Sequence, residues 1–230
     1  NTLATYKLVK TMRAGVLVLG SLLTKYGKAK VSLPGGCAIG TRPVDLHLFA
    51  LKKLGAKIKI KNGYILAEAK KGLKGAIINF PSISVGATEN ALLAACNAKG
   101  KTILKNCAIE PEIKDLIMFL NKLGSKINFK DRTITIYENK FKSSNISHEV
   151  IFDRIELGTY MIACALLVKK NITIDKIDPK IVKNEINVLK TIGVKIVIKK
   201  SSIIIKKNKK LKKINITTKP YPGFPTDLQA

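Results

Sequence analysis

Apolar and polar residues follow two different rhythms along this chain, one typical of helices and one typical of strands. Three apolar runs are long enough for helices: residues 14–23, 87–98 and 155–168. Three short segments are rich in β-branched residues, as strands are: residues 31–33, 102–104 and 172–174. In residues 43–54 the apolar side chains lie on one helical stripe, which predicts a further amphipathic helix.

The pattern repeats with a fixed period. Gly55, Gly124 and Gly193 stand in similar sequences at intervals of 69 residues. A proline follows a charged residue upstream of each of these glycines, and these prolines are 68 residues apart: Pro43, Pro111 and Pro179. The chain is therefore predicted to contain copies of one structural unit.

Each unit can be interpreted physically. Proline is expected to open a helix at its first turn, where the missing N–H has no partner to lose. The recurrent glycine is expected to end that helix, and two short strands follow, as in residues 56–61 and 64–69 around Asn62-Gly63. The unit is thus strand-helix-strand-helix-strand-strand, which places the chain in the α/β class.

The two ends of the chain differ from the middle. Before Met12 there is at most a stub of the first opening strand, and a fourth unit begins with a strand at 214–218 and a helix start at 224–227. We therefore expect an array that is incomplete at both ends, with a frayed C-terminal tail as the alternative.

Composition narrows the functional classes. The net charge of +27 suggests nucleic acid, but the lysines are scattered, aromatic residues are only 6%, and there is no Trp. The densest lysine cluster, residues 206–213, fits a solvated loop. We therefore expect no specific nucleic-acid partner.

The sequence also gives expectations for cellular location and for metal binding. No apolar run reaches the roughly 18 residues of a membrane span, and the most apolar one, 161–168, is predicted to be a buried helix. Residues 1–4 show no signal-peptide pattern, so a cytoplasmic protein is expected. Four cysteines without a CxxC pair, and two histidines, argue against a zinc site.

The glycine-rich segment 31–47 has the features of a reactive site. Cys37 lies among three glycines, which favours an exposed thiol on a loop that can approach a ligand closely. Arg42 stands at a predicted helix start, where backbone N–H groups already favour an anion. The structural alternative is a tight glycine turn with an incidental cysteine.

Three other helix starts are weaker candidates. Ser84 can cap the helix that follows it, and Gly86 leaves space for a polar ligand. Arg13 precedes the first apolar helix, and Asp227 lies in the first turn of the last one. An aspartate in that position most often complements the helix dipole only.

The same segments are similar to a known family. Residues 33–40 (LPGGCAIG) running into residues 42–47 (RPVDLH) resemble the UDP-N-acetylglucosamine enolpyruvyl transferases of peptidoglycan synthesis. Further matches, in the same order as in that family, are residues 10–14 (KTMRA), 84–90 (SVGATEN), 110–113 (EPEI), 153–156 (DRIE) and 224–230 (FPTDLQA). The resemblance spans the whole chain.

The resemblance implies an inside-out α/β barrel with two domains, each built from three repeats. Residues 1–150 then correspond to the second and third repeats of the first, cysteine-loop domain. Residues 151–230 correspond to the first repeat, and the start of the next, in the second domain. The substrates implied are UDP-N-acetylglucosamine and phosphoenolpyruvate, with no metal and no organic cofactor.

Site roles follow from the resemblance, residue by residue. Cys37 is implied as the proton donor and as the thiol that fosfomycin alkylates, and Asp227 as the group that takes the sugar hydroxyl proton or orients the sugar. Arg13 and Arg42 are implied to neutralise phosphate and carboxylate charge. The nucleotide is implied to lie along two segments: Arg42, Pro43, Val44, Asp45 and Leu46, and Ser82, Ile83, Ser84, Val85 and Gly86.

The sequence also departs from the family. The Lys-Asn pair near the family's N-terminus and the arginines of its C-terminal portion have no counterpart here, and Ser82 stands where many relatives have lysine. A separate chain supplying the missing repeats is one interpretation. The alternatives are a remnant that binds UDP-sugar without turnover, a basic RNA-binding protein, and a shikimate-pathway relative, which Cys37 disfavours.

Overall fold

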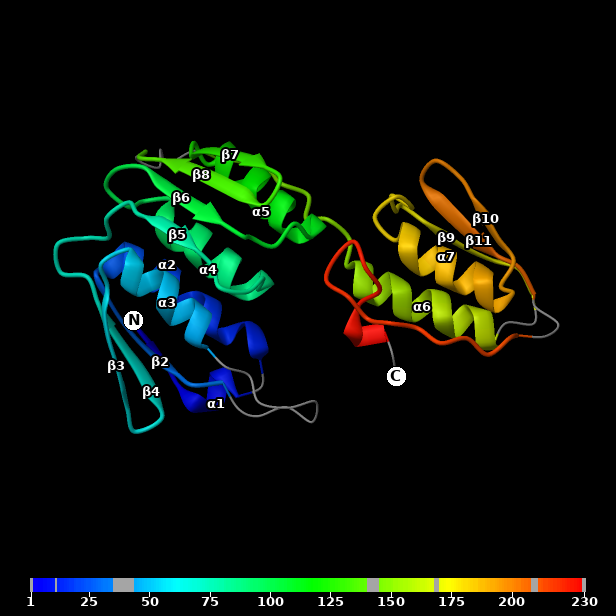
Figure 1. Ribbon diagram of the computed structural model, residues 1–230, viewed down its shortest axis with the longest axis horizontal. Coiled ribbons are helices and arrows are strands. Elements are labelled where there is room, and N and C mark those ends of the chain that lie inside the picture. The colour runs from blue at the N-terminus through cyan, green and yellow to red at the C-terminus, as the bar shows by residue number, and fades with distance from the viewer. Residues whose placement is uncertain are drawn as a thin grey trace. The chain divides into compact units, whose positions relative to one another are not determined.

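Helices and strands alternate along the first part of the chain, and each set ends in a hairpin (Figure 1). The computed structural model describes residues 2–10, 12–34, 44–139, 145–167, 170–207 and 211–228. The first set comprises β1 (Leu3–Ala4), α1 (Tyr6–Val9), the 3-10 helix η1 (Arg13–Leu17), α2 (Val18–Tyr26), β2 (Lys28–Ser32), α3 (Asp45–Lys53), β3 (Lys57–Lys61) and β4 (Tyr64–Glu68). The second comprises β5 (Ile77–Asn79), α4 (Val85–Ala95), β6 (Thr102–Lys105), α5 (Pro111–Lys122), β7 (Lys126–Lys130) and β8 (Thr133–Tyr137).

A third set forms the remainder of the chain. It comprises α6 (Arg154–Leu167), β9 (Ile172–Asp175), α7 (Lys183–Ile192), β10 (Ile196–Ile198), β11 (Ser202–Ile205) and the 3-10 turn η2 (Thr226–Leu228). The chain divides into two compact units, Asn1–His148 and Glu149–Ala230. Which repeats of a complete barrel these units supply stays a prediction.

The sheets confirm the repeat. Their strand orders are β1-β2-β4-β3 and β5-β6-β8-β7, so equivalent strands occupy equivalent places. In each sheet the first two strands are parallel, with Leu3 opposite Lys30 and Ile77 opposite Ile103, and the last pair is an antiparallel hairpin. The third sheet, β10-β11-β9, keeps the same hairpin beside the strand that precedes it.

Local turn chemistry explains where the elements end. Gly55, Gly124 and Gly193 have φ values of 93°, 98° and 107°, so each adopts the left-handed conformation that ends its helix. Asn62 and Gly63 both have positive φ, 50° and 73°, as a tight hairpin turn between β3 and β4 requires. These predicted stops are confirmed.

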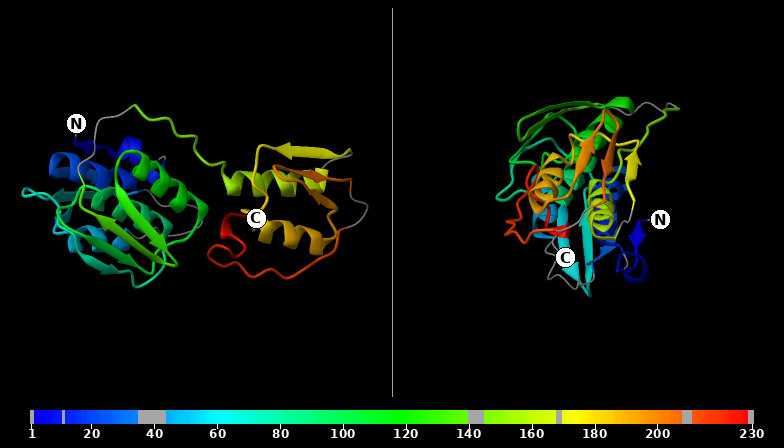
Figure 2. Two further views of the ribbon diagram at one scale, coloured as in Figure 1. Left: turned by 90° about the horizontal axis from the view of Figure 1, so that it is seen from above. Right: turned by 90° about the vertical axis from the view of Figure 1, so that its right-hand side faces the viewer.

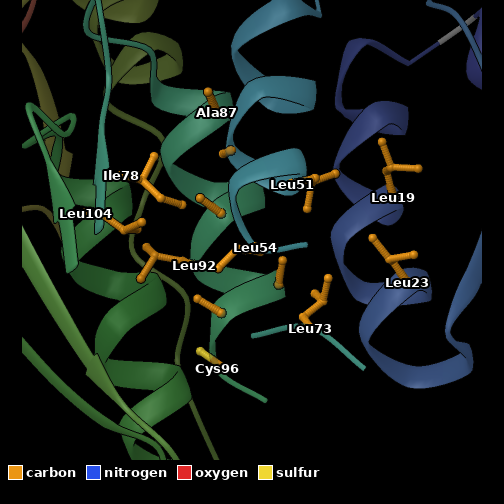
Figure 3. Packing of buried hydrophobic residues seen from close by; sticks show 14 of the residues in the cluster. Leu19, Leu23, Leu51, Leu54, Leu73, Ile78, Ala87, Leu92, Cys96 and Leu104 are labelled. Carbon is orange, nitrogen blue, oxygen red and sulfur yellow. The ribbon is translucent and has the colours of Figure 1, made fainter. Parts of the chain in front are cut away.

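In the first unit the helices lie inside and the sheets outside. Helices α2, α3 and α4 lie between the two four-stranded sheets (Figures 1 and 2). Their facing sides supply the core, shown in Figure 3 by Leu19, Leu23, Leu51, Leu54, Leu92 and Cys96. Burial of each such leucine contributes roughly 1.5 to 3 kcal/mol, which stabilises the packing of these helices against one another.

The second unit has its own smaller core. Met161 of α6, Ile186 of α7 and Ile203 of β11 are buried together. The prediction that 161–168 is a buried helix is only partly right, because Leu166 and Leu167 at the end of α6 are 65% and 78% exposed. A bilayer span needs about 20 apolar residues in one helix, and no helix within the described ranges meets that requirement.

Other differences from the predicted elements have local causes. Pro111 opens α5 as expected, but α7 begins at Lys183 and not at Pro179. There the Asp178 carboxylate accepts from Lys180 N–H at 3.0 Å and forms a turn ahead of the helix. The predicted strand at 214–218 is absent from the described residues, where Thr218 makes only an isolated bridge to Phe224.

Candidate functional site

Part of the predicted site lies outside the described residues. This applies to Cys37, Arg42 and Pro43 and to the side chain of Arg13, whose backbone begins η1. Their predicted roles therefore stay predictions. The structure does place the segments on either side, which belong to α3, α4 and η1.

At the start of α3, one exposed polar residue lies between two apolar residues that pack against the core. Val44 is the residue before the helix, and Asp45 is its first, exposed residue. Val44 and Leu46 are half-buried against the core. Asp45 can thus face solvent or a ligand while its neighbours fix the backbone, and its charge complements the helix N-terminus.

The start of α4 is capped by its own sequence. Ser84 Oγ accepts from Ala87 N–H at 3.3 Å, and Thr88 Oγ1 donates to Ser84 O at 2.8 Å. The predicted cap is confirmed. Ile83 and Val85 are half-buried against the core, whereas Ser82 is exposed.

The two helix starts meet at His47 and Gly86. A Cβ atom built on Gly86 stands 3.1 Å from His47 Cε1 and 3.4 Å from His47 Nε2. Gly86 therefore lets the imidazole of α3 lie directly against the first turn of α4. The structure brings the segments of Val44–Leu46 and Ser84–Gly86 together, as two predicted nucleotide-binding segments require.

Beneath this contact lies a polar side chain that sequence reasoning missed. Asn90 is fully buried, and its Oδ1 accepts from Gly20 N–H at 2.8 Å. Its Nδ2 donates to Val16 O at 3.2 Å and to His47 Nδ1 at 3.1 Å. One sequence signal was available, since Asn90 is a polar residue on the otherwise Ala-rich and Leu-rich face of α4.

Three glutamates of the first unit influence one another. Burial raises the pKa of Glu89 above its ordinary value, and the negative charges of Glu112 and Glu110 raise it further. Glu110 is buried, and its Oε2 accepts from Ile109 N–H at 2.8 Å. Among the described residues no group of three His, Cys, Asp or Glu side chains could hold a metal ion.

Asp227 lies in the second unit. It is exposed on η2, whose Leu228 is buried against Gly158 of α6. A Cβ atom on Gly158 would stand 3.2 Å from Leu228 Cδ2. The absence of a side chain at Gly158 therefore leaves space for the Leu228 side chain to pack against α6. Asp227 is therefore a carboxylate held at the surface by a buried neighbour.

Two of the described cysteines, Cys96 and Cys107, are buried in the core of the first unit. Burial raises the pKa of Cys96 to about 11 and that of Cys107 to about 12. Neither thiol forms appreciable thiolate near neutral pH, and thiolate is the reactive form. Cys96 and Cys107 are thus buried core residues, and burial also raises the pKa of the half-buried Cys164.

The chain is similar in sequence both to a protein family as a whole and to individual members of known name. The sequence profile of the EPSP synthase (3-phosphoshikimate 1-carboxyvinyltransferase) family matches residues 1–230. The chain is 61% identical over 229 residues to a UDP-N-acetylglucosamine 1-carboxyvinyltransferase of Pelagibacter ubique (strain HTCC1062), covering 100% of this chain and 55% of that protein. It is 50% identical to a protein of the same name from Rickettsia prowazekii (strain Madrid E), covering 99% of this chain and 54% of that protein.

Solved structures show the same fold. The enolpyruvyl transferase NikO from Streptomyces tendae matches with a TM-score of 0.83 at 21% identity, over 100% of this chain and 55% of that chain. EPSP synthase from Acinetobacter baumannii matches with a TM-score of 0.63 at 20% identity, over 89% of this chain and 48% of that chain. The predicted α/β fold of the enolpyruvyl transferase type is therefore confirmed.

The chain spans about half the length of the curated relatives it matches. Its fold matches that of a solved enolpyruvyl transferase over the whole chain, and the family profile extends from one end to the other. The chain belongs to the EPSP synthase (3-phosphoshikimate 1-carboxyvinyltransferase) family of enolpyruvyl transferases.

Proposed function

We propose that this protein transfers the enolpyruvyl group of phosphoenolpyruvate to the 3-hydroxyl of UDP-N-acetylglucosamine, the first committed step of peptidoglycan synthesis. The observation that carries the proposal is the 61% identity, over the whole chain, to a protein named for that reaction. The cysteine-containing sequence at 33–40 supports the same substrate over shikimate 3-phosphate.

The reaction is an addition followed by an elimination. The sugar hydroxyl adds to C2 of phosphoenolpyruvate while Cys37 protonates C3, and phosphate then leaves C2 of the tetrahedral ketal as C3 loses a proton, which restores the double bond. Asp227 takes the hydroxyl proton or orients the sugar. Arg13 and Arg42 neutralise the phosphate and carboxylate, whose charge shifts in the transition state.

The nucleotide is proposed to lie over the paired starts of α3 and α4. Support comes from the contact of His47 with Gly86, which holds these segments side by side, and from the exposed Asp45 and Ser82. The Ser84 hydroxyl accepts the bond of the helix cap and keeps its own hydrogen for a ligand.

The proposal extends to partners and location. Because the chain spans about half of its relatives' length, the remaining repeats are proposed to come from further sequence or from a separate chain. A nucleotide sugar and phosphoenolpyruvate are cytoplasmic metabolites, so we place the reaction there. Binding of UDP-sugar without turnover is the second candidate function, because positioning groups absent from half a site can cost orders of magnitude in rate.

The test combines labelling with turnover. We expect fosfomycin to add one covalent adduct at Cys37, measured by peptide mass spectrometry, with Cys37→Ser as the unlabelled control. Phosphate release from phosphoenolpyruvate should depend on UDP-N-acetylglucosamine and not on shikimate 3-phosphate. Titration calorimetry that detects UDP-N-acetylglucosamine binding without phosphate release would select the second candidate. The absence of both the adduct and the binding would refute both candidates.

A further inference from the structure

We propose that Asn90 is a positioning residue of the nucleotide-sugar site, acting through a buried hydrogen-bond network and not through contact with substrate. The inference rests on the proposed function, because the segments that it fixes are those proposed to hold the nucleotide. Its evidence is separate, since it comes from the geometry of helices α2, α3 and α4.

The Asn90 carboxamide joins two backbone groups that are one helical turn apart. Val16 O and Gly20 N–H have the i to i+4 spacing of an α-helical hydrogen bond, and Asn90 bonds both of them, at 3.2 and 2.8 Å. The two residues lie on either side of the junction where η1 becomes α2. Asn90 therefore sets the course of the chain from η1, which begins at Arg13, into α2.

The same carboxamide also holds α3. Its orientation is determined by its partners, because Gly20 N–H needs an acceptor and Val16 O needs a donor. Nδ2 is thus the atom that faces His47, and it donates to Nδ1 at 3.1 Å. A ring nitrogen that accepts carries no proton, so the neutral His47 imidazole has its hydrogen on Nε2, the nitrogen nearer Gly86.

Two glycines make the network possible. A Cβ atom on Gly20 would stand 2.7 Å from Asn90 O and still closer to Asn90 Oδ1, so any side chain there would displace Asn90. Gly86 has the corresponding role on the other side of His47. The Asn90 amide on α4 thus links that helix to η1, to α2 and to α3. The proposed ligand-binding segments lie at the starts of η1, α3 and α4.

Loss of the network should therefore misplace the ligand-binding segments. Asn90→Ala leaves Gly20 N–H, Val16 O and His47 Nδ1 without this partner, and relaxation moves the first turns of α3 and α4. Since small displacements of binding groups weaken binding strongly, we expect the dissociation constant for UDP-N-acetylglucosamine to rise roughly tenfold or more. Asn90→Asp keeps the acceptor for Gly20 but places a second carboxylate oxygen against Val16 O, so it should weaken binding at least as much.

A matched control is present on the same helix pair. Thr24 Oγ1 donates to Ala94 O at 3.1 Å, one turn farther along both α2 and α4, and that bond does not involve α3. Thr24→Val should lower the melting temperature without changing the dissociation constant. Titration calorimetry and thermal unfolding of the full chain, done side by side, separate positioning from stability.

A spectroscopic signature tests the network without a ligand. Nitrogen-15 NMR of the His47 ring should show the Nε2–H tautomer in the wild type and a change to Nδ1–H or to the charged ring in Asn90→Asp, whose carboxylate accepts. Amide shifts of residues 44–47 and 84–87 should change in Asn90→Asp and stay unchanged in Thr24→Val.

The outcomes distinguish the two proposals. Wild-type protein that binds no UDP-N-acetylglucosamine but shows the predicted tautomer and shifts would overturn the proposed function and support the positioning network. Unchanged affinity in both Asn90 variants, or an Nδ1–H tautomer in the wild type, would overturn the role of Asn90.

Discussion

Buried polar side chains in this protein behave differently according to whether a partner satisfies them. Asn90 and Glu110 are buried and hydrogen-bonded, whereas Glu185 Oε1 is buried with no hydrogen-bond partner among the described residues. An unsatisfied buried group costs free energy of folding, and an ionised one costs more. Burial also makes Cys96 and Cys107 unreactive.

Thiol reactivity should follow this burial. At pH 8 a thiol with a pKa of about 11 is only about one part in a thousand thiolate, so iodoacetamide should leave Cys96 and Cys107 of the native protein unlabelled. Mass spectrometry should find label at Cys37 first, and at Cys96 and Cys107 only after unfolding in guanidinium. Rapid native labelling of Cys107 would contradict its burial.

Glu185 gives a prediction with a definite sign. Burial raises its pKa above the ordinary value of 4.5, while its own backbone N–H and Arg154 act in the opposite direction. A raised folded-state pKa favours the protonated form, so the contribution of Glu185 to stability is present below its unfolded pKa and is lost as pH rises through the folded one. Glu185→Gln, which is always neutral, should stabilise the second unit by about 1 kcal/mol at pH 7 and by less at pH 4.

Denaturant unfolding at the two pH values measures the difference. Exposed Lys183→Gln, at the start of the same helix, is the control and should change stability by less than about 0.5 kcal/mol. A destabilised Glu185→Gln at pH 7 would mean that the carboxylate is satisfied.

At this scale the sequence predicts what depends on neighbours in the chain. The Ser84 cap involves bonds within four residues, and it was predictable. Asn90 and His47 are 43 residues apart, and Gly20 is 70 residues from Asn90. Their contact depends on how α2, α3 and α4 cross, which no local pattern specifies.

At the scale of elements, glycine stops and tight turns determine the architecture. The left-handed residues at Gly55, Gly124 and Gly193 end three equivalent helices and start three hairpins. These were predictable because only glycine adopts such φ values without strain. Helix α1, with four residues, was missed because it is too short to show a period, and the start of α7 was shifted by the Asp178 turn.

Substitution of Gly55 measures the effect of backbone strain on stability without a steric clash. A Cβ atom there meets nothing within 4 Å, so Gly55→Ala adds conformational strain without a steric clash. We expect a loss of about 1 kcal/mol in the free energy of unfolding, with a smaller loss for Gly55→Asn, because asparagine tolerates positive φ better. Chemical denaturation measures both, and equal losses for the two variants would show that strain is not the cause.

At the scale of the whole molecule, each of the two compact units has its own core. The buried cluster around Leu92 belongs to the first unit, and that around Ile186 belongs to the second. The repeat period alone specifies no division, and the prediction of two domains that meet near residue 150 came from the family resemblance. The exposure of Leu166 and Leu167 was not predicted, since an apolar run does not reveal what covers it.

Separate cores should unfold separately. Leu92→Ala removes a fully buried side chain and should destabilise the first unit by about 3 kcal/mol. Hydrogen exchange should then accelerate in α2, α3 and α4 and stay unchanged in α7. Ile186→Val, with an expected cost of about 1 kcal/mol, should give the reverse pattern. Acceleration in both units from either change would show that they unfold as one.

The lysines of the outer strands have a consequence for the behaviour of the chain among copies of itself. In the described sheets, β3 and β7 each have a neighbour on one side only, and Lys57, Lys59, Lys61, Lys126 and Lys130 on them are exposed. An edge strand can pair with a strand of another copy and so start aggregation, and regularly spaced like charges repel such an incoming strand. These five lysines, part of the +27 charge, should thus hinder the pairing of one copy's edge strand with that of another, in a protein with short, isoleucine-rich hairpins.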